Sequence, residues 1–372
     1  MVRAVLDLLE GLATIGVDVT LLTSSTKDIP TSWKDDAQAP KVITIERKMT
    51  PWFTLHKTTQ PPILDALANA DVLHLHTPWE PLNVPIAAEA RRTGTPYLVS
   101  AHGMLDDWSM AQHSTKKKFF LWLFGRRMLC GAFAMHFTAD AEAEQALRYV
   151  PGANAGVLPL LLDLAPYADP PGPEIARQAF PILAGNESKL LFLSRIHHKK
   201  GVERLIDTTA NLIQQGRKVQ TLIAGPGEED YLSSLKHRAV ELGVQQQVHF
   251  LGMVRGDTKL SLYNACDVFV LPTSQENFGI VLAEAMACGL PTVTTHGVDI
   301  ARELERCGAK IVSDQATPGE AELTTAIANL LDTPNQAATA ATTRAGVLDW
   351  LNPQRVLQDY LALYREACGL KT

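Results

Sequence analysis

The chain has 372 residues, of which 46% are hydrophobic, and its formal net charge is -6 at pH 7. This length predicts two globular domains, and the acidic balance excludes a general affinity for nucleic acid, so an anionic partner needs a local site. The five cysteines form no close pairs, which argues against a disulfide framework or a zinc site and favours a cytoplasmic location. No stretch reaches the roughly 20 apolar residues of a membrane span.

Apolar runs bounded by turn residues predict a series of strands in the first half of the chain. Stretches with helical periodicity, such as PLNVPIAAEARRTG (81–94), lie between most of these runs. Alternating strands and helices are typical of a parallel sheet covered by helices. The predicted strands are residues 17–23, 41–45, 71–77, 96–103, 132–138 and 156–160.

The proline-rich stretch DLAPYADPPGPE (163–174) interrupts this alternation and predicts a linker. The alternation then restarts, so two doubly wound, Rossmann-like domains in tandem account for the pattern, with residues 1–162 in the first and 163–350 in the second. Ligands of such sheets bind at the carboxyl ends of the strands, and we expect a cleft where the two domains face each other. The predicted strands of the second domain are residues 189–196, 218–227, 247–254, 267–274, 291–295 and 309–312.

Basic residues follow the first strand of the second domain, in the stretch LSRIHHKKG (193–201). Arg195 and Lys200 stand where a strand ends and a helix begins, and the free N–H groups and dipole of a helix start favour an anion. Taken alone, this stretch also fits a solvated basic loop. The next strand ends in AGPGEED (224–230), in which Gly225 and Gly227 permit close approach of a backbone or ligand.

Two glutamates flank the start of an apolar helix in ENFGIVLAEAMACGLPTV (276–293). Glu276 lies in the loop after a predicted strand, and Glu284 lies in the helix that we expect to begin near Ile280. A phosphate would repel either carboxylate. Sugar hydroxyls, in contrast, would donate hydrogen bonds to a carboxylate, as the ribose hydroxyls do in Rossmann folds. A favourable helix dipole or a surface position would explain one glutamate alone. Cations, glycines and glutamates at the ends of separate strands favour a nucleotide-sugar site.

Together these motifs resemble the retaining glycosyltransferases of the GT-B fold, family 4. The resemblance covers the second domain, and HLHTPWEPLN (74–83) and SAHGMLDDW (100–108) extend it into the first. It implies an acceptor domain over 1–162, a donor domain over 163–350 and a C-terminal helix in 351–372 that crosses back to the first domain.

The resemblance also assigns roles to residues. Arg195 and Lys200 would hold the donor diphosphate, Glu276 would contact the donor sugar, Glu284 would bind the ribose, and His102 would face the donor from the first domain. No metal or cofactor is implied, because cations and backbone amides would stabilise the leaving group. The remaining donor-site residues expected are Gly225, Gly227, Asn277, Phe278, Gly279 and Ile280.

The activity implied is that of a hexosyltransferase, which moves a sugar from a nucleotide-sugar to an acceptor hydroxyl with retention, in glycan, polysaccharide or glycolipid assembly. A doubly wound domain normally opens with a strand and a glycine-rich loop, whereas this sequence opens with a helical pattern, MVRAVLDLLEGLATIG. We therefore expect the first domain to lack its first strand. Either this sequence is shortened relative to a longer functional protein, or the activity of the protein is impaired. A non-catalytic nucleotide-sugar-binding or scaffold protein is the alternative.

The segment KKKFFLWLFGRRMLCGAF (116–133) is both basic and aromatic. It fits a helix that lies on a membrane surface near a lipid-linked acceptor, which would place the protein at the inner face of the membrane. Its apolar positions also fit a helix packed on the sheet, and we favour this second interpretation.

Overall fold

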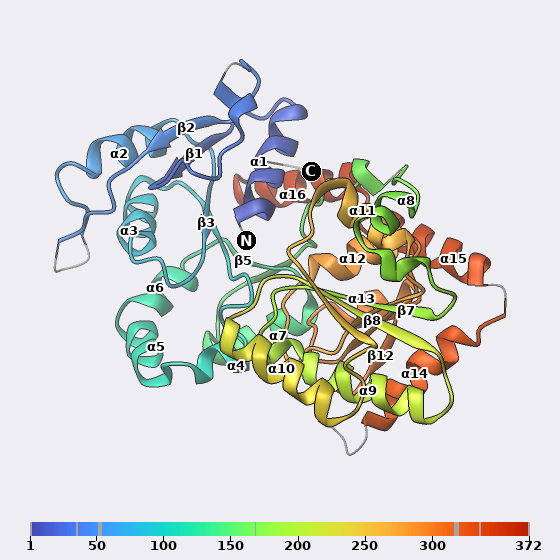
Figure 1. The fold of residues 1–372 in the computed structure, drawn as a ribbon. Helices are drawn as coiled ribbons and strands as arrows, with labels where there is room; N and C mark the ends of the chain where they lie inside the picture. Colours follow the sequence, from blue (N-terminus) through green and yellow to red (C-terminus); the bar gives the residue numbers. More distant parts are fainter. Residues whose placement is uncertain are drawn as a thin grey trace. The chain divides into compact units, whose positions relative to one another are not determined.

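The computed structural model describes residues 2–34, 36–50, 54–167, 169–315, 320–334 and 336–370, which form two compact units (Figure 1). Unit 1 comprises Met1–Asp163 and Leu351–Thr372, and unit 2 comprises Leu164–Trp350. The first boundary falls at the start of the proline-rich stretch. Each unit is a parallel sheet with helices packed on it, as the alternation of strands and helices predicts.

Unit 1 contains every strand that the sequence predicts for the first domain. Four of its strands form one parallel sheet in the order β3-β4-β5-β6, and β1 and β2 form a separate parallel pair. Among the described residues no strand pairs with the second edge of β1 or of β3. The strands are β1 (Thr20–Thr23), β2 (Lys41–Thr44), β3 (Leu73–His76), β4 (Tyr97–Ser100), β5 (Ala134–Phe137) and β6 (Ala155–Val157).

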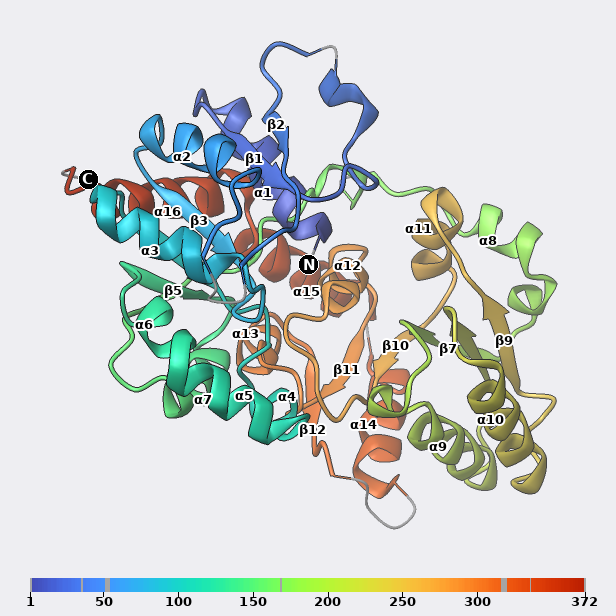
Figure 2. The ribbon, with the colours of Figure 1, turned by 90° about the vertical axis from the view of Figure 1, so that its left-hand side faces the viewer.

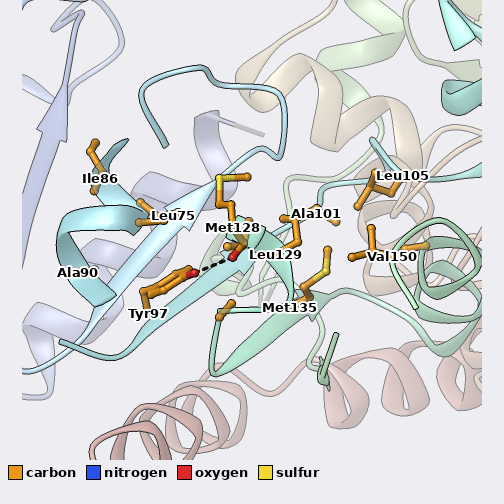
Figure 3. Packing of buried hydrophobic residues seen from close by; sticks show 14 of the residues in the cluster. Leu75, Ile86, Ala90, Tyr97, Ala101, Leu105, Met128, Leu129, Met135 and Val150 are labelled. Atoms are coloured by element: carbon orange, nitrogen blue, oxygen red, sulfur yellow. Dashed lines mark hydrogen bonds between the residues drawn. The ribbon is translucent and has the colours of Figure 1, made fainter. Parts of the chain in front are cut away.

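Two cores cover the faces of unit 1. In the first, Leu22 of β1 and Ile43 of β2 pack on the same cluster as Leu75 of β3, so the two sheets share one apolar layer. The Tyr97 hydroxyl, inside this cluster, donates to the Met128 carbonyl at 2.6 Å (Figure 3). The helical segments are α1 (Val2–Thr14), η1 (Thr31–Lys34), α2 (Gln60–Ala68), α3 (Asn83–Thr93), α4 (Asp107–Ala111), α5 (Ser114–Phe120), the π-helical η2 (Leu121–Gly125), α6 (Arg126–Leu129), α7 (Asp140–Tyr149) and α16 (Pro353–Ala367).

The second core brings the two ends of the chain together within unit 1. Leu8 and Leu12 of α1 pack with Val356 and Tyr360 of α16, and Figures 1 and 2 both show these helices side by side. Asn352 caps α16, because its side chain accepts from the N–H groups of the first turn. The apolar stripe of this helix therefore contributes to the first unit, although the helix follows the second unit in the sequence.

Unit 2 contains a six-stranded parallel sheet in the order β12-β11-β10-β7-β8-β9. Numbered from the first strand of the unit, this is 6-5-4-1-2-3, the order of a Rossmann sheet, and the direction of progression reverses between β7 and β10. Ligands of such sheets bind outside the carboxyl ends of the strands at that reversal. The strands are β7 (Ser188–Leu193), β8 (Val219–Ala224), β9 (Val248–Gly252), β10 (Val268–Leu271), β11 (Thr292–Thr295) and β12 (Lys310–Val312).

Helices cover both faces of the unit 2 sheet, with α9 beside α10 on one face and α12 on the other (Figure 2). Within the described residues, no helix combines the length and the apolar character that crossing a bilayer requires. The helical segments are η3 (Ala165–Tyr167), α8 (Glu174–Ala179), η4 (Pro181–Ala184), η5 (His198–Lys200), α9 (Val202–Gln214), α10 (Glu229–Glu241), α11 (Gly256–Asn264), α12 (Ile280–Ala287), α13 (Ala301–Arg306), α14 (Ala321–Leu331) and α15 (Gln336–Trp350).

Candidate functional site

The loops after β7 and β10 meet at the reversal point of the unit 2 sheet. The Lys199 carbonyl accepts from the Ser274 N–H at 2.8 Å and from the Thr273 hydroxyl at 2.7 Å. The Lys199 ammonium in turn donates to the Gln275 side chain at 3.0 Å. The stretch LSRIHHKKG is thereby fixed against the loop that carries Glu276, so two of the sequence motifs occupy one place in the fold.

Glycines at this end of the sheet allow neighbouring strand ends to touch. Gly201 has φ +69 and Gly225 has φ +142, values that side chains rarely adopt. A Cβ at Gly201 would fall on the Pro272 carbonyl, and one at Gly225 would fall on the Ser194 carbonyl. Close packing of strand ends therefore explains Gly225 by itself, and its role in donor binding stays a prediction, as does that of Gly227.

Lys200 and Glu276 form an ion pair between Nζ and Oε2. The Lys200 side chain is only 4% exposed, whereas that of Glu276 is 23% exposed and reaches the surface. The backbone holds Glu276 on both sides, because its N–H donates to Gly297 at 2.8 Å and its carbonyl accepts from Asp299 at 3.0 Å. The sequence predicts separate ligands for the two charged groups, and the structure adds a direct contact between them.

Arg195 is exposed and has no hydrogen-bond or ion-pair partner within the described ranges. Its surroundings are electropositive. The pKa of the nearby His197 is lowered, first by desolvation and then by the charges of Lys199, His198 and Arg195. An anion at this position would offset that repulsion, which is the property expected of a diphosphate site.

Glu284 is buried in α12, where its side chain is 4% exposed, and two groups of α11 contact it. Lys259 donates to Oε1 at 2.9 Å, and the Tyr263 hydroxyl donates to Oε2 at 3.0 Å. Burial, followed by the charge of Glu284, raises the pKa of Tyr263 well above its usual value. Sequence reasoning missed both partners, although their spacing of four residues places them on one face of a helix.

The start of α12 at Ile280 agrees with the helix start that the sequence predicts. Gly279, at φ +63, precedes the first turn, whose N–H groups lack partners inside the helix. The side chains before it point to other protein groups. The Asn277 amide donates to Asp299 at 3.1 Å, and the buried Phe278 ring stacks on Trp350 with centroids 5.9 Å apart. The donor-binding roles of Asn277, Phe278 and Gly279 stay predictions.

His102 lies in unit 1, directly after β4, with a left-handed backbone at φ +52. Residues with a strained backbone of this kind are frequent at functional sites, and the strained conformation persists where surrounding groups hold it in place. Here the fixing group is Glu142, which is 1% exposed and accepts from the Gly103 N–H at 2.6 Å. The other carboxylate oxygen accepts from the N–H and the hydroxyl of Thr138, at 2.7 and 2.9 Å. Sequence reasoning did not single out Glu142.

His102 belongs to a histidine cluster, which consists of His74, His76, His102 and His136. Nδ1 of His76 lies 3.1 Å from Nε2 of His102, and His74 bonds to the Tyr364 hydroxyl of α16 at 2.8 Å. Desolvation, followed by the charges of neighbouring histidines, lowers the pKa of His76 to about 3 and that of His102 to about 2. The same causes lower the pKa of His74, and desolvation lowers that of His136. These rings are therefore neutral near pH 7.

Within the described part of the chain, no group of three or more histidine, cysteine, aspartate or glutamate side chains is placed to hold a metal ion. The charged groups near the reversal point include two lysine–glutamate pairs, the unpaired Arg195, Lys199 and Asp299. In this arrangement the carboxylates can accept hydrogen bonds from hydroxyls, and the neighbouring cations can attract phosphate.

Comparison with known proteins identifies the family. The sequence profile of glycosyl transferases group 1 matches residues 176–344, and that of the glycosyl transferase 4-like domain matches residues 1–160. The chain belongs to the group 1 glycosyltransferases. The family resemblance read from the sequence motifs is thus confirmed.

Relatives of this glycosyltransferase include an uncharacterized glycosyltransferase of Methanocaldococcus jannaschii, 41% identical over 111 residues, which are 30% of this chain and 27% of that protein. A D-inositol 3-phosphate glycosyltransferase of Catenulispora acidiphila is 26% identical over 98% of this chain and 92% of its own length. Among solved structures, Anabaena HepE in complex with UDP-glucose has a TM-score of 0.73 at 18% identity, over 99% of this chain and 96% of that one. This likeness shows that the glycosyltransferase has the GT-B fold.

Proposed function

We propose that this glycosyltransferase transfers a hexose from a UDP-sugar to an acceptor hydroxyl with retention of anomeric configuration. The observation that carries the proposal is that the loop after β7, which contains Arg195 and Lys200, is bonded to the loop before α12, which contains Glu276, at the reversal point of a Rossmann sheet. The choice of uracil rests on the UDP-glucose bound to HepE, a protein of the same fold. Residues 164–350 are then the donor domain, and the first unit is the acceptor domain.

In the proposed reaction the bond between the anomeric carbon and the diphosphate oxygen breaks, and negative charge grows on the leaving group. Arg195, Lys200 and the N–H groups at the start of α12 stabilise that charge, which is the largest catalytic contribution expected here. The acceptor oxygen bonds to the anomeric carbon from the same face. Its proton passes to the departing phosphate oxygen, so the products are the glycoside and the nucleoside diphosphate.

The two glutamates have different roles in this proposal. Glu276 accepts hydrogen bonds from hydroxyls of the donor sugar, because its carboxylate reaches the surface beside the cations. Glu284, held by Lys259 and Tyr263, accepts from the ribose diol. His102 contributes from unit 1 as a neutral side chain that can donate or accept a hydrogen bond but carries no charge.

The acceptor is a hydroxyl of a glycan or of a lipid-linked sugar, in polysaccharide or glycolipid assembly. Residues 116–133 would bring the enzyme from the cytoplasm to the inner face of the membrane, where a lipid-linked acceptor resides. The basic and aromatic composition of this segment supports the location.

A panel of nucleotide-sugars, scored by thermal stabilisation and then by turnover, tests the proposed donor. A ligand present at 100 times its dissociation constant adds about 2.7 kcal/mol to the free energy of unfolding. For a unit of this size that corresponds to a rise in the unfolding midpoint of roughly 5–10 °C. A UDP-sugar should give this shift, with UDP released only when an acceptor is present. If no nucleotide-sugar stabilises the protein, the donor site is wrongly assigned.

We also propose that one more parallel strand belongs between β1 and β3 of unit 1. If the added strand is counted as strand 1, then β1 and β2 become strands 2 and 3, and β3 and β4 become strands 4 and 5. The order β2-β1-added strand-β3-β4 is then 3-2-1-4-5, the order of a Rossmann sheet. Both sheets already pack on shared cores. The second candidate function is a non-catalytic nucleotide-sugar-binding protein.

Joining an apolar strand and a glycine-rich loop ahead of α1 separates the two candidates. If the protein is an enzyme, the addition should raise turnover and the protease resistance of unit 1 while UDP-sugar binding stays unchanged. Binding without turnover in both forms would support the non-catalytic candidate. Full activity and a protease-resistant unit 1 without the addition would contradict the proposed strand.

A further inference from the structure

The helical segment from α5 through η2 to α6, residues 114–129, presents an unusual outward surface. Exposed side chains recur every three to four residues along this segment, so they form one stripe along the helix. Trp122 is 73% exposed, Phe119 is 60% exposed and Leu123 is 46% exposed. This stripe, called the α5–α6 face, consists of Lys116, Lys118, Phe119, Trp122, Leu123, Arg126 and Arg127.

The opposite side of the same segment packs into the protein. Leu121, Met128 and Leu129 are buried in the core of unit 1. A helix on a soluble protein normally pairs such a buried side with a polar outer side. Here the middle of the outer side is apolar, and the rings of Phe119 and Trp122 lie 5.9 Å apart on it. Packing on the sheet, the interpretation favoured from the sequence, accounts for the buried side and leaves the exposed rings unexplained.

Cations surround the apolar middle of the α5–α6 face. Residues 114–133 contain five lysines and arginines and no aspartate or glutamate, in a chain whose net charge is -6. Lys116, Lys118, Arg126 and Arg127 form no salt bridge with any described acidic residue. The face is therefore a local cationic surface on an acidic protein, and its complement is an anionic surface that also accepts apolar side chains.

A pocket of about 540 Å³ adjoins the face. Leu123, Phe124 and Met128 supply apolar lining, while Arg91 and Arg127 are among the polar lining residues. Arg91 is held in place, because it donates to the Tyr97 hydroxyl at 2.8 Å. Guanidinium groups beside apolar lining residues suit the phosphate of a lipid headgroup whose acyl chains lie next to it.

We propose that the α5–α6 face docks on an anionic phospholipid surface. Phe119, Trp122 and Leu123 enter the boundary between headgroups and acyl chains, the lysines and arginines contact lipid phosphates, and the adjoining pocket takes one headgroup. This inference rests on the proposed function, because that function supplies the lipid-linked acceptor. It adds which face of the protein contacts the membrane that contains this acceptor. The docking itself requires no turnover.

Co-sedimentation with vesicles tests the proposal on the full chain. Vesicles of phosphatidylglycerol and phosphatidylcholine in equal parts should bind the protein, vesicles of phosphatidylcholine alone should bind it far more weakly, and salt should reduce the binding. The variant Phe119→Glu/Trp122→Glu should lose binding by about tenfold or more. Met253→Glu is the matched control, because Met253 is 53% exposed in unit 2 and its change should leave binding unaltered.

A second pair of variants separates charge from apolar contact. Lys116→Gln/Lys118→Gln should weaken binding to anionic vesicles by about fivefold for each charge removed at low salt. Lys27→Gln/Lys57→Gln removes two exposed lysines elsewhere in unit 1 and should change little. Equal effects of the two pairs would mean that net charge, and not this face, governs the contact, and would overturn the proposal.

Other outcomes identify other occupants of the face. Failure to bind anionic vesicles, or full binding by Phe119→Glu/Trp122→Glu, would overturn the proposal. A wild-type dimer that this variant converts to a monomer, without vesicle binding, would assign the face to a second copy of the chain. UDP-sugar stabilisation measured on the same variants should stay at the wild-type value. If no UDP-sugar stabilises the wild type or any variant while the wild type still binds anionic vesicles, the donor assignment is refuted and the proposed docking surface is not.

Discussion

Glu284→Gln tests the division of roles between the two glutamates. A glutamine keeps the shape of the side chain but replaces one acceptor oxygen by a donor, which would point at ribose hydroxyls or at Lys259 and Tyr263. We expect affinity for UDP alone to fall by about tenfold or more, because the diol loses one acceptor oxygen and the negative charge on the other. Affinity for a UDP-sugar should fall by the same factor, since the lost contact does not involve the sugar.

The structure also sets the cost of this change to folding. Lys259 is 18% exposed and would lose its counter-charge, while Tyr263 is fully buried. Removing one partner of a buried ion pair costs about 3–5 kcal/mol, and the partial exposure of Lys259 reduces this to about 2–3 kcal/mol. The unfolding midpoint of unit 2 should fall by roughly 4–12 °C. Calorimetric titration well below that midpoint therefore separates lost binding from lost folding.

Tyr263→Phe is the matched control. It removes one donor to Glu284 without changing any charge, at a cost of about 1 kcal/mol to unfolding. Affinity for UDP should stay within a few-fold of wild type, because Lys259 still holds the carboxylate. If Glu284→Gln leaves the affinity for UDP unchanged and lowers only the additional affinity for a UDP-sugar, Glu284 contacts the donor sugar and the assigned role is refuted.

Three further outcomes are expected. Arg195→Ala and Lys200→Ala should each lower kcat by about a hundredfold or more while donor affinity falls less, because these cations meet charge that grows during the reaction; turnover unchanged from wild type in both variants would contradict their assignment. Glu142→Gln puts a donor amide against Thr138 and should displace the turn that carries His102, lowering kcat while UDP binding stays unchanged. Acid should destabilise unit 1 specifically. The histidine cluster is neutral when folded and protonated when unfolded below pH 6.5, so its stabilisation is present above that pH. It is lost as pH falls toward 3, by up to about 1.4 kcal/mol per histidine per pH unit. Urea unfolding at pH 7.5 and 5.5 checks this, and a midpoint independent of pH would refute it.

The fold could be predicted because its signals are local. Each strand is a short apolar run between turn residues, and each prediction needs only neighbours in the sequence. The helix start at Ile280 was equally visible, because Gly279 and the apolar run after it mark a helix terminus.

Contacts between side chains on different elements could not be predicted in the same way. Lys259 stands 25 residues before Glu284, and Lys200 stands 76 residues before Glu276. Nothing in a single sequence tells which of its many lysines a buried carboxylate will meet, because the answer depends on the register of packed helices. Glu142 escaped notice for the same reason, since its partners are backbone N–H groups after two other strands.

The pairing of both glutamates changes how the donor site must work. Before a ligand arrives, Glu276 and Glu284 each contact a lysine, so these two pairs carry no net charge. Arg195 and Lys199 then supply the excess positive charge that attracts a diphosphate. Bound phosphate would compete with Glu276 for the buried ammonium of Lys200, and the freed carboxylate would turn to the hydroxyls of the sugar. A nucleoside diphosphate without a sugar would leave that carboxylate beside phosphate without a hydroxyl partner. This arrangement therefore favours the complete donor over the product, and it predicts that Glu276→Gln narrows the difference in affinity between UDP-sugar and UDP.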